Sequence, residues 1–326
     1  MIALSKIVAG RLLLGIVTLL ITSMVIFGAM ELLPGDFAQA VLGQSATEET
    51  VRAFRTELQL DQPVFVRYFD WLLNALQGDF GQSFSGRASS GYDRSRAVVD
   101  LVAPRMSNTI LLAGLTAAIS VPLALGLGFA AVLYRGTWFD RALNWTVLGA
   151  ISFPEFLIAY ALILLLASLF PVFPALANVS PDMAWDERLS RMALPAASLT
   201  IVIMAHMMRM TRAALNDLMA RPYVETAKLK GLSRRRIVLV HVLPNAWAPI
   251  ATVIAFNLAY LIVGVVVVEV VFAYPGIGQL MVDAVTSRDI PVVQTCALVF
   301  AGTYIVLNLL ADVIAIMTNP RLLHPK

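Results

Sequence analysis

"ETAKLKGLSRRRIVLVHVLPNA", residues 225–246, places the densest positive charge of the chain directly before a long apolar run. Five of the 24 Lys and Arg residues fall within residues 228–236. The chain is 59% hydrophobic and only 14% charged, whereas charged residues make up about a quarter of a soluble domain. Because apolar sequence lies on both sides of the cluster, we predict an all-α integral membrane protein with this stretch in a loop between two spans.

Six apolar segments are about as long as the helix of roughly 20 residues that crosses a bilayer. They lie between Arg11 and Glu31, Arg105 and Arg135, Arg141 and Asp182, Arg191 and Arg209, His241 and Glu269, and Asp289 and Asp312. We therefore predict six transmembrane helices, the third interrupted only by Glu155. The first segment follows Lys6 and Arg11 as a secretory signal would. Its apolar run is too long for one and lacks a small-residue cleavage site, so we expect an uncleaved anchor.

The positive charges predict the orientation of the chain. If the amino terminus is cytoplasmic, 14 of the Lys and Arg residues lie on the cytoplasmic side and only three lie in the two short outer loops. The first outer loop, residues 31–105, holds the remaining seven, but loops longer than about 60 residues cross largely regardless of their charge. We predict that both termini and the quoted stretch face the cytoplasm.

The first outer loop carries two helical patterns. Ser45 and Glu48 form a capping-box pattern, and the residues after them place Val51, Phe54 and Leu58 on one helical face. Pro63 suits the first turn of a second helix. The apolar stripe expected on that helix consists of Phe65, Phe69, Leu72, Leu73 and Leu76. We predict a helical extracytoplasmic loop, which either caps the bundle or docks an external partner.

Within the quoted stretch, local signals predict a helix, a turn and a second helix. Pro222 suits a helix start, and Glu225 lies where the positive end of the helix dipole favours a carboxylate. Gly231 is a natural stop, and Ser233 can cap the next helix. A short helix over Tyr223–Lys230 is thus held near the membrane by a span at each side, so a push on it would reach both spans. Alternatively, its basic residues could simply attract anionic lipid.

The spacing of Glu225, Ala227, Gly231 and Leu243-Pro244 resembles the "EAA" signature of the permease subunits of ABC importers. Thr226 replaces the first alanine of that signature.

The segment "HVLPN", residues 241–245, resembles the peptide and nickel branch of these importers, although His241 stands where isoleucine is usual. The chain is therefore identified as a member of the B-type permease subunits of dipeptide/oligopeptide ABC importers. Near the end, Asn319 replaces the usual aspartate, and Gln59 replaces the glycine of a usual L-G-L-D. The other similar stretches are "LLPGD" (32–36), "ELQLDQPVFVRYFDWL" (57–72), "GDFGQS" (78–83), "EVVFAYPGIGQL" (269–280) and "NLLADV" through "NPR" (308–321).

This resemblance implies a permease that forms half of a translocation pathway with a homologous second permease, two ABC ATPase subunits and an extracytoplasmic substrate-binding protein in the bacterial inner membrane. It implies a division into residues 1–103, the first span and outer loop, and residues 104–326, the permease core with its signature loop at about 209–245. The signature loop is implied to be a coupling helix that binds the ATPase. Its residues are Tyr223, Val224, Glu225, Thr226, Ala227, Lys228, Leu229, Lys230 and Gly231.

Several kinds of chemistry lack their motifs. No G-x-x-x-x-G-K-[ST] occurs, so we expect no nucleotide binding of the P-loop kind, and the resemblance places ATP and Mg²⁺ in the partner ATPase. H-E-x-x-H and G-x-S-x-G are also absent, so we expect no catalytic activity in this chain. His206, His241 and His324 lack ligand spacing, and we expect no metal or cofactor. The single Cys296 excludes an internal disulfide. No basic domain stands apart from the apolar segments, so we expect membrane lipid and no nucleic acid as a partner.

Glu155, Glu269 and Asp312 lie within or at the ends of apolar runs, where a carboxylate is costly and often functional. Each could contact cargo, but Glu269 and Asp312 lie close to the ends of their spans and could instead be solvated or paired with an arginine. Buried carboxylates and six spans also fit a self-sufficient channel or ion-coupled carrier, and a non-transporting scaffold is a third possibility. The cargo stays open among dipeptides, oligopeptides, nickel chelates, glutathione and sugars.

Overall fold

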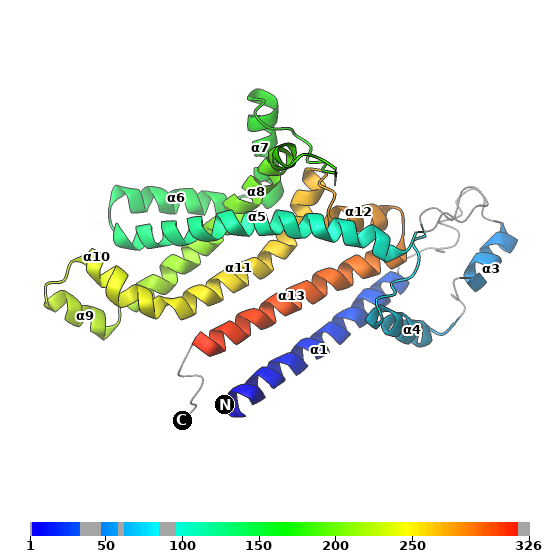
Figure 1. Ribbon diagram of the computed structural model, residues 1–326, viewed down its shortest axis with the longest axis horizontal. Helices are drawn as coiled ribbons and strands as arrows, with labels where there is room; N and C mark the ends of the chain where they lie inside the picture. The colour runs from blue at the N-terminus through cyan, green and yellow to red at the C-terminus, as the bar shows by residue number, and fades with distance from the viewer. Residues whose placement is uncertain (1, 33–46, 58–61, 85–95, 181, 319–326) are drawn as a thin grey trace. The chain divides into compact units, whose positions relative to one another are not determined.

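A computed structural model describes residues 2–32, 47–57, 62–84, 96–180 and 182–318. These residues are mainly helical, joined by turns and by an irregular segment over residues 170–184, and they contain an isolated bridge between Gln82 and Ala97. The predicted all-α class is therefore confirmed (Figure 1). The helices are α1 (Ile2–Glu31), α3 (Glu48–Glu57), α4 (Val64–Leu76), α5 (Val98–Leu133), α6 (Trp138–Ser152), α7 (Glu155–Ile163), α8 (Trp185–Met219), α9 (Pro222–Leu229), α10 (Arg234–Arg236), α11 (Leu243–Val271), α12 (Ile277–Thr286) and α13 (Ile290–Thr318), with π-helical segments η2 (Leu164–Leu169) and η3 (Ile237–Val242).

Five of the described helical stretches are long and apolar enough to cross a membrane: α1, α5, α8, the stretch from α10 to α11, and α13. A sixth span exists if the pair formed by α6 and the α7–η2 stretch counts as one. The six predicted spans correspond to these segments. The structure shows that the third is not a straight helix.

The third span bends by 102° between Ser152 and Glu155. Phe153 is extended, with φ −93° and ψ 137°, because the ring of the following Pro154 disfavours helical backbone in the preceding residue. Pro154 then precedes α7 with φ −58° and ψ 146°. Glu155 therefore occupies the first turn of a new helix, not the middle of a span.

The chain divides into two compact units, and each is described by itself. Unit 1 comprises residues 1–15, 111–274 and 304–326, and unit 2 comprises residues 16–110 and 275–303. In unit 1, α8 packs along α11 and also contacts α6 and α7. A Cβ at Gly128 of α5 would lie only 2.9 Å from Cγ2 of Thr211 in α8, so the small residue lets these two helices approach closely. The buried core of this unit includes Leu199, Ile203, Met207, Leu261, Val265 and Val268.

Unit 2 holds the predicted outer-loop helices and α12. No helix was predicted from the sequence at the position of α12. The Ser83 hydroxyl donates to Oδ2 of buried Asp289 at 2.5 Å, and the Phe84 N–H donates to Oδ1 at 3.1 Å. These bonds fix the "GDFGQS" stretch to the residue that precedes α13.

The predicted second outer helix is present as α4, with Pro63 directly before its first residue. Its main buried contact is Tyr68, whose hydroxyl bonds the Ser23 hydroxyl at 2.8 Å. The expected apolar stripe does not bury within this unit, since Phe65, Phe69, Leu73 and Leu76 are 55–76% exposed. The first predicted outer helix is present as α3, which begins at Glu48, whereas a capping box would place Glu48 at the third helical position. Ser45 lies outside the described residues, so the capping box stays a prediction.

Candidate functional site

The predicted short helix is present as α9, Pro222–Leu229, and begins one residue earlier than Tyr223. Pro222 occupies the first helical position, where its missing N–H costs nothing. The helix ends in a Schellman motif: the Gly231 N–H bonds the Lys228 carbonyl at 2.9 Å, and the Leu232 N–H bonds the Ala227 carbonyl at 3.2 Å. Gly231 has φ +75°, the left-handed conformation that this motif requires. Lys230 is therefore the residue that follows the helix, not part of it.

One face of α9 is buried within unit 1. Val224 is 0% exposed and Ala227 is 7% exposed. Both belong to a cluster that joins α9 to the ends of its neighbours, and we call this cluster the inner face contact. Its other buried members are Val132 of α5, Leu215 of α8, Ile237, Val238 and Val242 of η3, and Ala246 and Ile250 of α11.

The opposite face of α9 is open, and we call it the outer face. Leu229 is 85% exposed and Tyr223 is 39% exposed, although both side chains are large and apolar. Glu225 is exposed as well. Partial burial raises the pKa of the Tyr223 phenol above its ordinary value, and nearby Arg221 opposes this shift. The phenol is therefore protonated near neutral pH and can donate a hydrogen bond.

The turn after α9 is fastened to α5 by Arg234. Its guanidinium donates from Nε at 3.1 Å and from Nη2 at 2.8 Å to the Val132 carbonyl, in the last turn of α5. A cation suits this position because the carboxyl end of a helix carries unpaired carbonyls and partial negative charge. Ser233 precedes α10 as predicted, but its side chain makes no capping hydrogen bond.

An ion pair holds the start of α6 to α8 in the same unit. Nη2 of Arg212 lies 2.7 Å from Oδ1 of buried Asp140, and Arg212 also donates to Asn144. The Gly136 N–H bonds Oδ2 of Asp140 at 3.0 Å. Sequence reasoning missed this pair because its members are 72 positions apart and neither has a local signal.

The three candidate carboxylates have different surroundings. Glu155 is half-buried and hydrogen-bonded to Tyr260 of α11, whose ring lies 5.6 Å from that of His206 in α8. Asp312 pairs with Arg11 at 3.0 Å, which matches the expectation of an arginine partner. Glu269 is fully buried near the end of α11. Glu155 and Asp312 thus have different partners, and neither partner belongs to α9.

The remaining sequence candidates do not form a second site. His241 lies in η3 and is half-buried, Cys296 is buried in α13, and His324 lies outside the described residues. Among the described residues, no group of three His, Cys, Asp or Glu side chains could hold a metal ion. The outer face of α9, with the exposed Tyr223, Glu225 and Leu229, is the candidate site.

The sequence matches two family models. The model described as binding-protein-dependent transport system inner membrane component matches residues 120–324. The corresponding model of the amino-terminal membrane component matches residues 4–113.

Curated relatives align over almost the whole chain. The glutathione transport system permease protein GsiC of Escherichia coli (strain K12) is 36% identical over 314 residues, covering 96% of this chain and 97% of the relative. A putative peptide transport system permease protein of Brucella abortus (strain 2308) is 34% identical over 320 residues, covering 97% and 98%. Among solved structures, the MetNI methionine ABC transporter has a chain with a similar fold, with a TM-score of 0.55 at 15% identity, covering 68% of this chain and 97% of that one.

Proposed function

Because the chain belongs to the family of binding-protein-dependent transport system inner membrane components, and is thus a multi-pass permease subunit of an ABC importer, we propose that it carries dipeptides or oligopeptides. It would form half of the pathway with a homologous permease, and an extracytoplasmic binding protein would deliver the cargo. The names of two relatives, a glutathione and a putative peptide permease, support a peptide cargo, since glutathione is itself a small peptide. The peptide cargo is tested by measuring uptake of labelled di- and tripeptides with nickel chelates and sugars as competitors. We expect uptake of the peptides and no competition from the nickel chelates or sugars.

We propose further that the outer face of α9 binds an ABC ATPase subunit on the cytoplasmic side. The observation that carries this proposal is the division of α9 into a buried and an open face. Leu229, which is 85% exposed, and Tyr223, which is 39% exposed, leave apolar area in water that a partner's cleft would cover. Glu225 adds a charged group that a basic side chain of the partner can pair with.

The inner face contact explains how movement of the ATPase would reach the spans. Val224 and Ala227 touch a cluster that includes residues of α5, α8 and α11, and the chain itself joins α9 to α8 and to η3. Interiors are close-packed, so displacement of α9 moves its neighbours with it. ATP-driven closure of the ATPase pair would thereby change which side of the membrane the pathway opens to.

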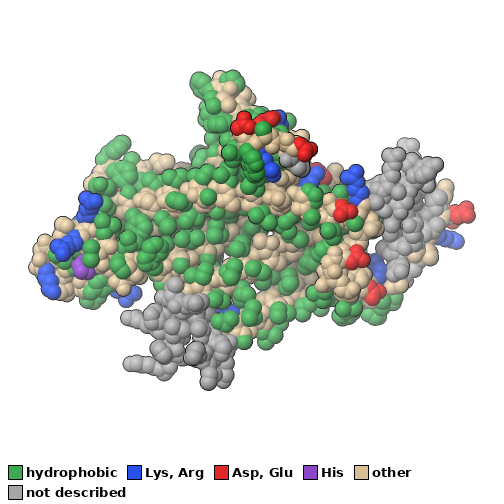
Figure 2. All heavy atoms as spheres, viewed as in Figure 1, with side chains coloured by type: hydrophobic (Ala, Val, Ile, Leu, Met, Phe, Trp, Pro, Cys, Tyr) green, Lys and Arg blue, Asp and Glu red, His purple; other side chains and the backbone are tan. Residues whose placement is uncertain are grey.

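The proposed orientation has both termini in the cytoplasm. Figure 2 shows Lys and Arg side chains gathered around α9 and α10 in unit 1, with hydrophobic side chains over the neighbouring helices. Excess positive charge marks the cytoplasmic side of membrane proteins. Labelling of single cysteines introduced at exposed Arg235 and Asp186, at opposite ends of unit 1's spans in this orientation, tests it in intact cells.

The docking proposal is tested by reversing the charge of Glu225. In the reconstituted importer, Glu225→Lys should lower cargo uptake at least tenfold while the chain still inserts and assembles with the second permease. The matched control is Asp186→Lys, which makes the same charge change at an exposed position. Asp186 lies in the first turn of α8, and α9 follows the opposite end of α8. It should leave uptake near the wild-type rate.

Two outcomes would contradict the proposal. Normal ATP-coupled uptake by Glu225→Lys at normal expression would show that the outer face does not bind the ATPase. Uptake by this chain alone in liposomes, driven by an ion gradient and indifferent to ATP, would instead favour the ion-coupled carrier.

A further inference from the structure

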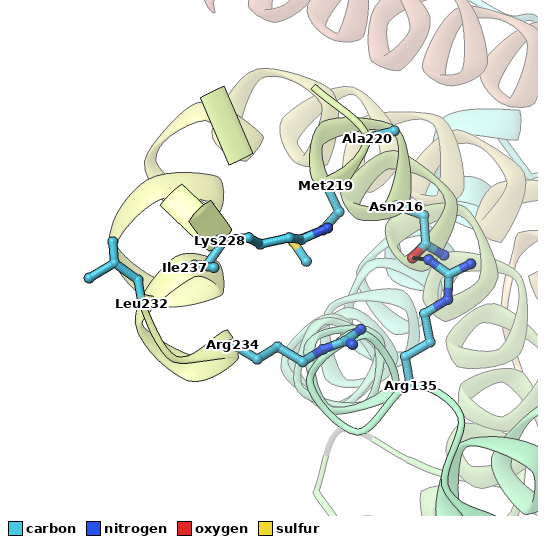
Figure 3. A pocket seen from close by; sticks show the side chains of 8 residues that line it. All are labelled: Arg135, Asn216, Met219, Ala220, Lys228, Leu232, Arg234 and Ile237. Carbon is cyan, nitrogen blue, oxygen red and sulfur yellow. Dashed lines mark hydrogen bonds between the residues drawn. The ribbon is translucent and has the colours of Figure 1, made fainter. Parts of the chain in front are cut away.

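A pocket of about 460 Å³ lies in unit 1 between the end of α9 and the ends of its neighbours. Its walls come from the turn after α5, the end of α8, the end of α9, and α10 with η3 (Figure 3). The described residues that line it are Arg135, Asn216, Met219, Ala220, Lys228, Leu232, Arg234 and Ile237. Three of these are cations, and none is a carboxylate.

The cationic side chains converge from three different elements. In Figure 3, Lys228, Arg234 and Arg135 extend toward the same opening, with Asn216 beside the Arg135 guanidinium. The contact between Nη1 of Arg135 and Oδ1 of Asn216 is long, at 3.4 Å. Within the described part of the chain, the Lys228 ammonium has neither an ion pair nor a hydrogen bond. Arg234, by contrast, donates two hydrogen bonds to the Val132 carbonyl, at 3.1 Å and 2.8 Å.

Helix ends explain part of this charge but not all of it. The pocket lies at the carboxyl ends of α5, α8 and α9, and each such end is equivalent to at most about half a negative charge. The three ends together therefore offset at most about one and a half of the three positive charges. An excess of about one and a half positive charges remains, facing a space large enough for a small anion.

We propose that this pocket binds a phosphate group. Arginine guanidinium forks match the oxygens of phosphate, and a lysine adds a point charge, so the lining supplies the donors that a phosphate requires. Met219, Leu232 and Ile237 form an apolar wall beside the cations, which suits the glycerol and first methylenes of a phospholipid. The phosphate can come from an anionic membrane lipid or from solution. The proposal does not depend on docking of the ATPase to α9.

The test uses the full-length chain in its importer complex, purified in detergent. Native mass spectrometry measures retained phosphatidylglycerol, and equilibrium binding of radiolabelled inorganic phosphate measures the soluble source. We expect Arg135→Gln and Lys228→Gln each to weaken binding about fivefold, the effect of one cation near an anionic headgroup. Retention of phosphatidylglycerol alone identifies a lipid site, and binding of inorganic phosphate identifies a soluble-phosphate site.

Controls separate a pocket from general charge attraction. Arg235→Gln and Arg236→Gln remove neighbouring exposed cations that do not line the pocket and should leave binding unchanged. Arg135→Lys keeps the charge and should keep most of the binding, which tests folding of the site independently. The proposal is overturned if the wild type retains neither ligand, or if the two controls weaken binding as much as Arg135→Gln.

Retention of the ATPase, measured in the same samples, distinguishes this proposal from the proposed docking of the ATPase. Arg135 lies outside α9, so Arg135→Gln should retain the ATPase while losing phosphate. A complex that loses the ATPase on outer-face substitution but binds no phosphate supports docking and contradicts the pocket.

Discussion

Two turns in unit 1 interrupt the course of the helices, and they differ in what they leave open. At Gly231, between α9 and α10, one face of the preceding helix is packed and the other face is free. At Pro154, between α6 and α7, the charged group that follows the break is already satisfied, because Glu155 bonds Tyr260 of a neighbouring helix. The first turn therefore presents groups to a partner, whereas the second is a joint within the fold.

The difference shows how to tell an interaction surface from an architectural feature in this chain. A charged residue in an apolar segment drew attention to Glu155, yet its partners are internal. Leu229 carries no charge and has no motif chemistry of its own, yet it is more exposed than Tyr223, the other large apolar side chain that α9 leaves in solvent. Unmet packing, more than charge, marks the surface that needs a partner.

The largest effect at the first turn is expected from a charge placed on the buried face of α9. Val224→Asp should lower the free energy of unfolding by about 3 kcal/mol, because it buries an unpaired carboxylate in the cluster shared by α5, α8 and η3. Thermal unfolding in detergent, followed by tryptophan fluorescence, measures the loss.

The matched control is Leu229→Asp, the same new charge on the outer face. It should change the free energy of unfolding by no more than about 0.5 kcal/mol, since an exposed side chain loses little packing. It should nevertheless release the ATPase during purification. Equal destabilisation by both substitutions would contradict the division of α9 into two faces.

The next largest effect is expected from the link between the first turn and α5. Arg234→Met removes both hydrogen bonds to the Val132 carbonyl and should cost about 2 kcal/mol, the typical worth of bonds to a charged donor. Unfolding of the purified chain gives the value. Arg235→Met, an exposed neighbour without this contact, is the control, and a similar loss in both variants would contradict a specific link.

The course of the first turn could be predicted from sequence because its signals are local. Pro222 and Gly231 fix the two ends of α9 by their backbone chemistry alone, and the predicted helix agrees with the structure to within one residue at each end. The faces of α9 could not be predicted, since eight residues are too few for a periodic pattern and the inner face depends on distant partners. The Arg234 contact joins positions 102 residues apart, for which no local pattern exists.

The second turn could be predicted only in part. Pro154 signals a break, but the 102° bend depends on how α7 packs on α8 and α11. The sequence analysis therefore expected one continuous span. The role of Glu155 was left open because its hydrogen-bond partner, Tyr260, lies 105 positions away.

The second turn is tested by adding a side chain at Gly264, next to the Glu155 carboxylate. A Cβ at Gly264 of α11 would lie 3.0 Å and 3.1 Å from the two carboxylate oxygens of Glu155. Gly264→Ala should therefore force the carboxylate from Tyr260 and cost about 1.5 kcal/mol by overpacking. Thermal unfolding measures the cost. Gly114→Ala in α5 is the control: nothing lies within 4 Å of its Cβ, so alanine should be neutral or stabilising there.

The smallest effect is expected from substitution of Gly231 in the first turn, which changes the backbone preference without a steric clash. Gly231 has φ +75° and open space around the position of a Cβ, so any cost of substitution comes from conformation and not from a clash. Gly231→Ala should lose about 1 kcal/mol, the lower end of the penalty for a left-handed residue with a side chain. Gly231→Asn should lose less, because asparagine tolerates that region and can still end the helix. If the Schellman turn holds α9 at its angle to α10, the free energy of unfolding and the rate of ATP-coupled uptake should both be lowest with alanine, intermediate with asparagine and highest with glycine. Equal losses for both variants, or no loss for alanine, would contradict this role of the turn.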